Sequence, residues 1–143
     1  MGPSSFEAGE VISDLGELYT TEGQPTKGPR FYERARSIIE QALGSEHREV
    51  GEALSGLGQS YLDLHRADLA VPVLERALRL RTDETPSRMA PLWFALARAL
   101  WEVGSDRPRA VALASQAAAP ALRPGDGVTH DDIAAWLAVH TPR

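Results

Sequence analysis

The residues that most invite a catalytic interpretation are His47, Arg48 and Glu49, which follow the order of the His-Arg-Asp triplet in a phosphoryl-transfer catalytic loop. That chemistry needs an aspartate as base, a downstream asparagine for the metal, a glycine-rich loop over the phosphates and an Asp-Phe-Gly triplet. Here glutamate replaces the aspartate, and the other parts are missing from the sequence. We therefore predict that the three residues form a turn between two helices.

Metal binding has no better basis. His130, Asp131 and Asp132 carry metal-capable side chains, but neighbours on a helix point in different directions and no other histidine stands at a ligand spacing. We interpret the aspartates as the first turn of a helix, where carboxylates meet the positive end of the dipole. His65 and His140 lack a nucleophile or base partner, and the chain has no cysteine. The sequence thus predicts no catalytic, metal-binding or cofactor-binding residue and no enzymatic activity.

The composition is that of one helical domain. The chain has 143 residues, 43% of them hydrophobic, and alanine, leucine, arginine and glutamate dominate. No secretory signal opens it, and no apolar run approaches the roughly 18 residues of a membrane span. We therefore expect a cytoplasmic location and no membrane association. Met1-Gly2-Pro3-Ser4-Ser5 is typical of a cloning remnant or of a cut inside a longer protein.

Charge is distributed unevenly. Residues 1–64 carry 11 acidic and 5 basic side chains, a net charge of −6, whereas residues 65–123 carry 6 acidic and 9 basic, a net charge of +3. A nucleic-acid-binding protein usually concentrates its cations on one face. This mild basic excess is spread over many arginines, so we expect no nucleic-acid partner.

A pattern of apolar and small residues repeats along the chain. Leu15-Gly16 with Tyr19 recurs 42 residues later as Leu57-Gly58 with Tyr61. A third, degraded copy has Ala97-Arg98 and Trp101. Together with Ile12, Leu54 and Phe94, which stand three residues before each copy's first position, they fall at i, i+3, i+4 and i+7, one stripe of a helix. A second stripe such as Ala70, Leu74 and Ala77 follows a short turn. Each copy therefore predicts a helical hairpin that must stack on its neighbours to bury its apolar face.

These hairpins define the expected organisation, an all-α superhelix of seven helices. Residues 1–6 are expected to be disordered or left from cloning, and residues 7–122 to form three repeats at about 9–44, 47–82 and 86–119. A linker at 123–128 leads to a capping helix at 129–140, which Thr129 should cap. Gly44 is expected to end one helix and Thr85-Pro86 to begin another. Pro72 falls inside its helix, so it should remove a hydrogen bond unless the helix starts late or bends.

The segments Leu15-Gly16-Glu17-Leu18-Tyr19, Tyr32-Glu33-Arg34-Ala35 and Pro72–Leu78 resemble tetratricopeptide repeats of the kinesin-light-chain type, which are about 42 residues long. The resemblance covers about residues 7–119. The alanine-rich third copy, with the end Asp132–Leu137, is similar to the C-terminal repeat regions of bacterial, notably myxobacterial, serine/threonine kinases. Arg98 departs from the family, which has a small residue there, so it must turn outward or open the third hairpin.

The resemblance implies a protein-binding scaffold whose concave groove takes a peptide or helix of a partner, lined by the first helix of each hairpin. The positions carried over for this groove are Glu10, Ser13, Glu17, Thr20, Glu52, Ser55, Gln59, Leu62 and Glu102, with Leu92, Ala95 and Ala99 on the third copy. Glu10, Glu17 and Glu52 would make one acidic surface, which favours a basic or amphipathic partner. The alternative is that they are ordinary solvated helix residues.

Trp93 is the tryptophan expected to be partly exposed, because Trp101 and Trp136 fall on core stripes. Tryptophan is enriched at interfaces, so Trp93 joins the predicted partner-binding residues. Leu92 and Trp93 could equally support self-association as a homodimer. A second functional reading follows from this, namely an oligomerisation or intramolecular regulatory tail of a larger serine/threonine kinase, without catalytic activity.

Overall fold

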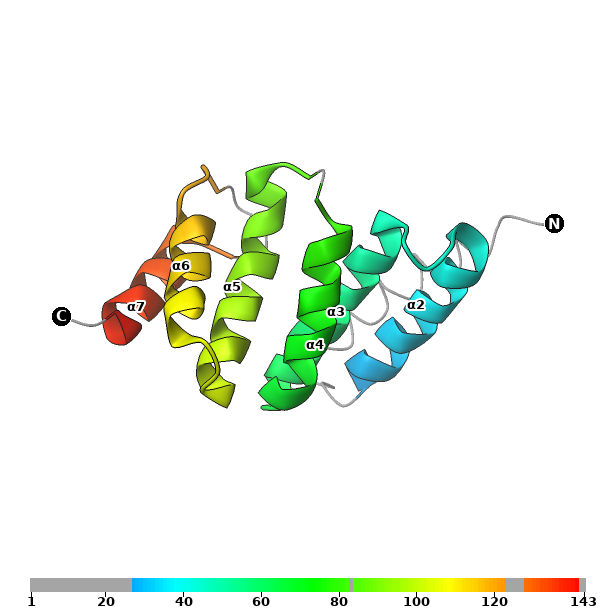
Figure 1. Ribbon diagram of the computed structural model, residues 1–143, viewed down its shortest axis with the longest axis horizontal. Helices are drawn as coiled ribbons and strands as arrows, with labels where there is room; N and C mark the ends of the chain where they lie inside the picture. The colour runs from blue at the N-terminus through cyan, green and yellow to red at the C-terminus, as the bar shows by residue number, and fades with distance from the viewer. Residues whose placement is uncertain (1–26, 83, 123–127, 142–143) are drawn as a thin grey trace. The chain divides into compact units, whose positions relative to one another are not determined.

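The computed structural model describes residues 27–82, 84–122 and 128–141, and every regular element in these ranges is an α-helix (Figure 1). The chain divides into two compact units, residues 1–81 and 82–143. The first helix expected from the sequence lies outside the described residues, and the other six are present. The all-α prediction is therefore confirmed for the described part of the chain.

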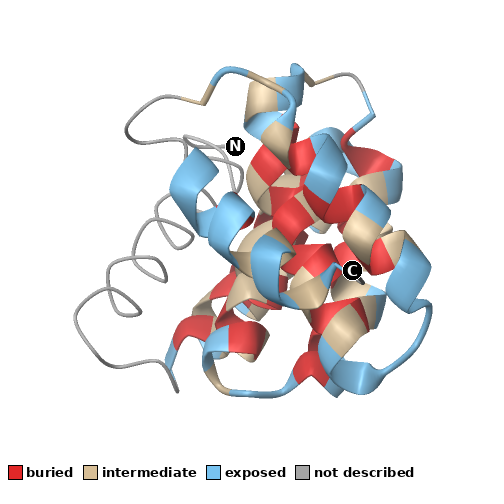
Figure 2. Ribbon diagram, turned by 90° about the vertical axis from the view of Figure 1, so that its left-hand side faces the viewer, coloured by how far each residue is buried: buried red, intermediate tan, exposed pale blue. Residues whose placement is uncertain are grey.

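The first unit contains helices α2 (Gly28–Leu43), α3 (Arg48–Asp63) and α4 (Ala67–Leu80). Consecutive helices pack against one another, α2 on α3 and α3 on α4. Their buried residues recur at helical spacing, as in Tyr32, Ala35 and Ile39 of α2, so each helix turns one side to its neighbours (Figure 2). The core of the unit is built from these stripes.

Two glycines of α3 allow this close packing. A Cβ at Gly58 would overlap the buried side chain of Leu74 on α4, and a Cβ at Gly56 would overlap the ring of Tyr32 on α2. Gly58 is the small position of the repeat pattern, and its missing side chain lets α3 and α4 approach closely.

The second unit contains α5 (Pro86–Val103), α6 (Arg107–Ala118) and α7 (His130–His140). Helix α6 packs against α5 through Ala110, Ala114 and Ala117, which are completely buried, and α7 packs against α6. Thr129 caps α7 in a reciprocal pair with Asp132: its side chain accepts from the Asp132 backbone N–H, while the Asp132 carboxylate accepts from that of Thr129. This is the helix start expected from the sequence.

The helix boundaries follow local chemistry elsewhere too. Gly44, at a φ of 93°, ends α2, and Pro86 opens α5 directly after Thr85. Helix α4 continues past Pro72, whose side chain is exposed, so α4 neither starts after the proline nor stops there. Pro91 likewise lies inside α5.

Candidate functional site

The predicted groove residues of the second repeat lie on α3, within the first unit. Glu52, Ser55 and Gln59 are half-buried and fall on one side of the helix, at spacings of three and four residues. Leu62 is different, because it is only 3% exposed and belongs to the core. Its assignment to a partner-binding surface is therefore wrong, because its side chain packs in the core.

Ser55 is already engaged by its own unit. Its hydroxyl donates to the carbonyl of Gly51 at 2.9 Å and accepts from Nη1 of Arg81 at 2.8 Å. Arg81, directly after α4, is 8% exposed and lies so close to α3 that a Cβ at Gly51 would be 2.6 Å from its Cγ. Ser55 therefore has no proton left to donate to a partner, and it acts in joining α3 to the end of α4.

Asp63 lies on the same side of α3 and was not among the site residues predicted from the sequence. Its Oδ1 accepts from Nε2 of Gln59 at 3.0 Å, and its side chain is exposed. The i, i+4 spacing of Gln59 and Asp63 could have revealed it. The three side chains Glu52, Gln59 and Asp63 are called the acidic face of α3 below.

The predicted residues of the third repeat lie on α5, in the second unit. Trp93 is half-buried and Glu102 is exposed, so both retain surface. Leu92, Ala95 and Ala99 are buried, at 4% exposure or less. Of the expected Leu92–Trp93 contact pair, only the tryptophan is accessible. Glu10, Ser13, Glu17 and Thr20 fall outside the described residues.

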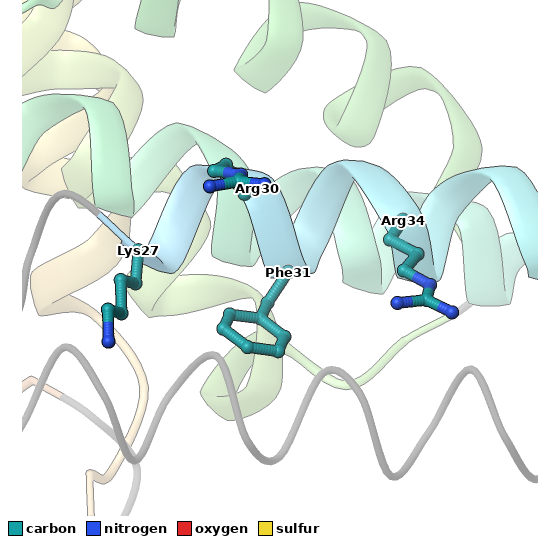
Figure 3. A pocket seen from close by; sticks show the side chains of 4 residues that line it. All are labelled: Lys27, Arg30, Phe31 and Arg34. Carbon is teal, nitrogen blue, oxygen red and sulfur yellow. The ribbon is translucent and has the colours of Figure 1, made fainter.

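A stripe of opposite charge lies on α2. Lys27, Arg30, Phe31 and Arg34 stand at i, i+3, i+4 and i+7 and line a hollow of about 270 Å³. Figure 3 shows Lys27, Phe31 and Arg34 extending from one side of the helix. Counting charge over residues 1–64 concealed this stripe, because the many carboxylates of that half outweigh it.

Charge pairs join the outer helices of the first unit. Arg76 of α4 donates to Oε1 of Glu40 at 2.6 Å and to the carbonyl of Ser45 at 3.1 Å. Arg36 bridges Glu33 and Glu40 on α2, at 3.0 and 2.7 Å. The hydrogen bond to Glu33 is the largest cause that raises the pKa of Arg36 above its ordinary value, with the charges of Glu33 and Glu40 adding to it. This network joins α2 to α4. It occupies the carboxylates of Glu33 and Glu40, which a simple count of charges would have treated as available to a partner.

The end of the second unit is held by aromatic rings. Trp136 of α7 meets Phe94 and Trp101 of α5 edge-on, at 6.0 and 5.7 Å, and stacks on His140 at 4.1 Å. Arg107 lies over the Trp101 ring at 4.7 Å. These contacts give Trp101 and Trp136 a packing role, as expected. Arg98 lies over Phe94 at 5.8 Å, so it turns aside and leaves the α5–α6 hairpin closed.

The histidines that prompted enzymatic interpretations have local structural roles. Nδ1 of His47 accepts from the backbone N–H of Glu49 at 3.2 Å and so caps α3. Nε2 of His130 accepts from the N–H of Leu122 at 3.4 Å, and Nδ1 of His140 is 2.6 Å from the carbonyl of Trp136. Among the residues that the structure describes, no group of three or more histidine, aspartate or glutamate side chains is placed to hold a metal ion. Nor is any described helix both long and apolar enough to cross a membrane.

Comparison with known proteins agrees with this architecture. The family model for the tetratricopeptide repeat matches residues 7–83, just over half of the chain, and the chain therefore belongs to the tetratricopeptide repeat family. No curated protein matches it.

Two solved structures share the fold of this chain. Two crystal structures of nearly identical TPR-like repeats, assigned to a kinesin light chain of Podosopora anserina, superpose with TM-scores of 0.71 and 0.75 at 21% and 20% identity. They cover 92% and 96% of this chain, which spans only 64% and 67% of theirs. At this identity the similarity establishes the fold, so the predicted kinesin-light-chain type of repeat is confirmed.

Proposed function

We propose that this protein is a non-catalytic adaptor that binds a basic peptide segment of a partner protein on the acidic face of α3. Tetratricopeptide repeats in general mediate protein–protein interaction, and on this face the exposed Asp63 carboxylate and the half-buried Gln59 amide lie one helical turn apart. Glu52 and Asp63 carry negative charge, and the Gln59 amide nitrogen is directed to Asp63. Charge complementarity then favours lysine and arginine on the partner.

The observation that carries the proposal is the hydrogen-bonding character of this face. Carboxylates only accept, and Gln59 donates one of its two amide hydrogens to Asp63 at 3.0 Å, which leaves one N–H and the carbonyl oxygen. Ser55, between them, is committed to Gly51 and Arg81. The face therefore offers mainly acceptors to a partner that supplies donors, and its negative charge disfavours a C-terminal carboxylate.

The test is a binding titration of the full chain with a fluorescent lysine- and arginine-rich peptide, followed by anisotropy at low and physiological salt. We expect saturable binding that weakens as salt rises. A Glu52→Lys/Asp63→Lys variant should lose it, whereas Asp68→Lys on α4 should bind as the wild type does. Asp68 is a matched control, because it is an exposed aspartate of the same unit. Equal binding by all three proteins would contradict the assignment of the site.

The remaining sequence-based expectations extend this proposal. They are three repeats at about 9–44, 47–82 and 86–119, a cytoplasmic location, a role within a larger bacterial regulatory protein and further partner contacts at Trp93, Glu102, Glu10, Ser13, Glu17 and Thr20. The pairing of α3 with α4 and of α5 with α6 supports the second and third repeats. The kinase-tail role and homodimerisation stay predictions from the sequence.

A further inference from the structure

Helix α7 is apolar on the side that packs against its neighbours and also on the opposite side. Its inner side carries Ile133, which is completely buried, and the half-buried Trp136. The side chains of the opposite side, called the outer face of α7 below, are all exposed: Ala134, Ala135, Ala138 and Val139. Val139 alone is 78% exposed. A helix that is apolar all round is normally buried all round, so the outer face of α7 has the character of a contact surface.

The exposed side of another helix shows how unusual this is. On α2 the side turned away from the core carries the cations Arg30 and Arg34. In α7 no aspartate, glutamate, lysine or arginine follows Asp132. A side chain without charge loses little when it leaves water, whereas a charged one must be paired. The outer face of α7 can therefore be covered without leaving a charge unpaired.

The distribution of charge favours a second copy of this chain as the partner. Residues 82–143 carry 7 acidic and 6 basic side chains, a net charge of −1, whereas residues 1–81 carry 13 acidic and 9 basic, a net charge of −4. Two identical proteins repel each other least where their charge is closest to zero. Helix α7 belongs to the nearly neutral unit, so repulsion opposes self-association least there.

We propose that two copies of this chain associate through the outer faces of α7, packed antiparallel about a two-fold axis midway between Trp136 and Leu137. Each Val139 then lies opposite Ala134 of the other copy, so that a larger side chain meets a smaller one. The two Asp131 carboxylates stand about 16 Å apart along the helices, at 1.5 Å per residue, whereas a parallel pair would bring them together. The inference goes beyond the proposed function and does not depend on it.

This assignment moves the homodimer predicted from the sequence to a different helix. The predicted pair was Leu92 and Trp93, but Leu92 is only 2% exposed. Helix α7 has 11 residues and is therefore about 16 Å long. One side of such a helix is smaller than the roughly 800 Å² per partner of a stable interface. We therefore expect a reversible dimer that dissociates on dilution.

Sedimentation equilibrium of the full chain, from about 10 µM to about 1 mM, measures the association in the range expected of a small interface. The average mass should rise with concentration from that of a monomer toward twice that value. Val139→Glu places a carboxylate in the apolar contact, so it should weaken association at least about ten-fold. Val103→Glu is the matched control, because Val103 is an exposed valine of the same unit, at the end of α5. Circular dichroism checks that both variants fold.

The absence of cysteine from the chain allows the geometry to be tested as well. In the antiparallel pair the two copies of position 138 are about 4.5 Å apart along the helices, and those of position 131 about 16 Å. Ala138→Cys should therefore form a disulfide between copies under mild oxidation, and Asp131→Cys should not.

Three results would overturn the proposal. The first is a monomer mass at every concentration, and the second is equal association by Val139→Glu and the wild type. The third is faster cross-linking of Asp131→Cys than of Ala138→Cys, which would contradict the antiparallel arrangement.

Discussion

The hairpins α3–α4 and α5–α6 have the same architecture but achieve the close approach of their helices differently. In α3–α4 the approach depends on a missing side chain, since Gly58 lies where any Cβ would overlap Leu74. In α5–α6 the corresponding residue is Arg98, and the approach is made by the buried alanines of α6 while the arginine lies over Phe94. The repeat fold thus requires the two helices of a hairpin to lie close together, and either a glycine or a set of alanines can allow it.

The largest loss of stability is expected when the space left by Gly58 between α3 and α4 is filled. Gly58→Leu must displace Leu74, which is completely buried, so we expect a loss of about 3 kcal/mol. The loss should lower the melting temperature by roughly 10 °C. All three tryptophans lie in the second unit, so far-UV circular dichroism should report a larger change than tryptophan fluorescence. Ala42→Leu, at an exposed position of α2, is the control, and an unchanged melting temperature for Gly58→Leu would refute the packing account.

The turns of the two hairpins provide a second comparison. Asp106 has a φ of 50°, and its carboxylate accepts from the N–H of Arg109 at 3.2 Å. In the other turn His65 has a φ of 59°, but α4 begins after Arg66 without a side-chain cap. Asp106→Ala should cost about 1 kcal/mol, because it removes the cap and places alanine in the left-handed region. Thermal unfolding followed by tryptophan fluorescence measures this. Asp106→Gly should cost less, and a smaller loss for alanine than for glycine would contradict the explanation.

Arg98 tests whether the third repeat tolerates its departure from the family. Arg98→Ala removes one cation–π contact with Phe94, so we expect a loss below about 1 kcal/mol and an intact α5–α6 hairpin. The reciprocal change, Gly58→Arg, should be strongly destabilising because no ring or solvent receives the side chain there. Denaturant unfolding of both variants measures the contrast, and similar losses would show that the two hairpins pack alike after all.

The smallest effect concerns the ion pair that begins α4. The hydrogen bond from Arg66 is the largest cause that lowers the pKa of Asp68 below its ordinary value of 3.8. The pair's contribution to folding is therefore present above pH 3.8 and is lost as the pH falls through the lower folded value. Carboxyl NMR titration should find this low pKa, and Arg66→Gln should raise it toward the ordinary value. A titration unaffected by Arg66→Gln would rule the pair out.

The sequence predicted the framework because a repeat presents the same physical requirement several times. Gly58, Leu74 and the alanines of α6 occupy positions whose spacing alone marks them as buried. The Thr129 cap and the closure at Gly44 follow from local chemistry in the same way. These elements depend on neighbours in the chain or on a period, which a sequence displays directly.

The surface could be predicted less well, because contacts between distant residues decide which side chains remain accessible. Leu62 follows the groove period but is buried, and Ser55 is occupied by Arg81, 26 residues away. Glu40, likewise, is held by Arg76 from another helix. A period places a residue on a side of its helix, but it does not say what reaches that side from elsewhere.

The central claim, that a basic segment binds along α3, is tested most directly by amide hydrogen exchange of the full chain with and without the lysine- and arginine-rich peptide. We predict slower exchange confined in the main to α3, between Glu52 and Asp63, with α6 and α7 unchanged. Protection centred on α5 around Trp93, or on the cationic stripe of α2, with none on α3 would contradict the account.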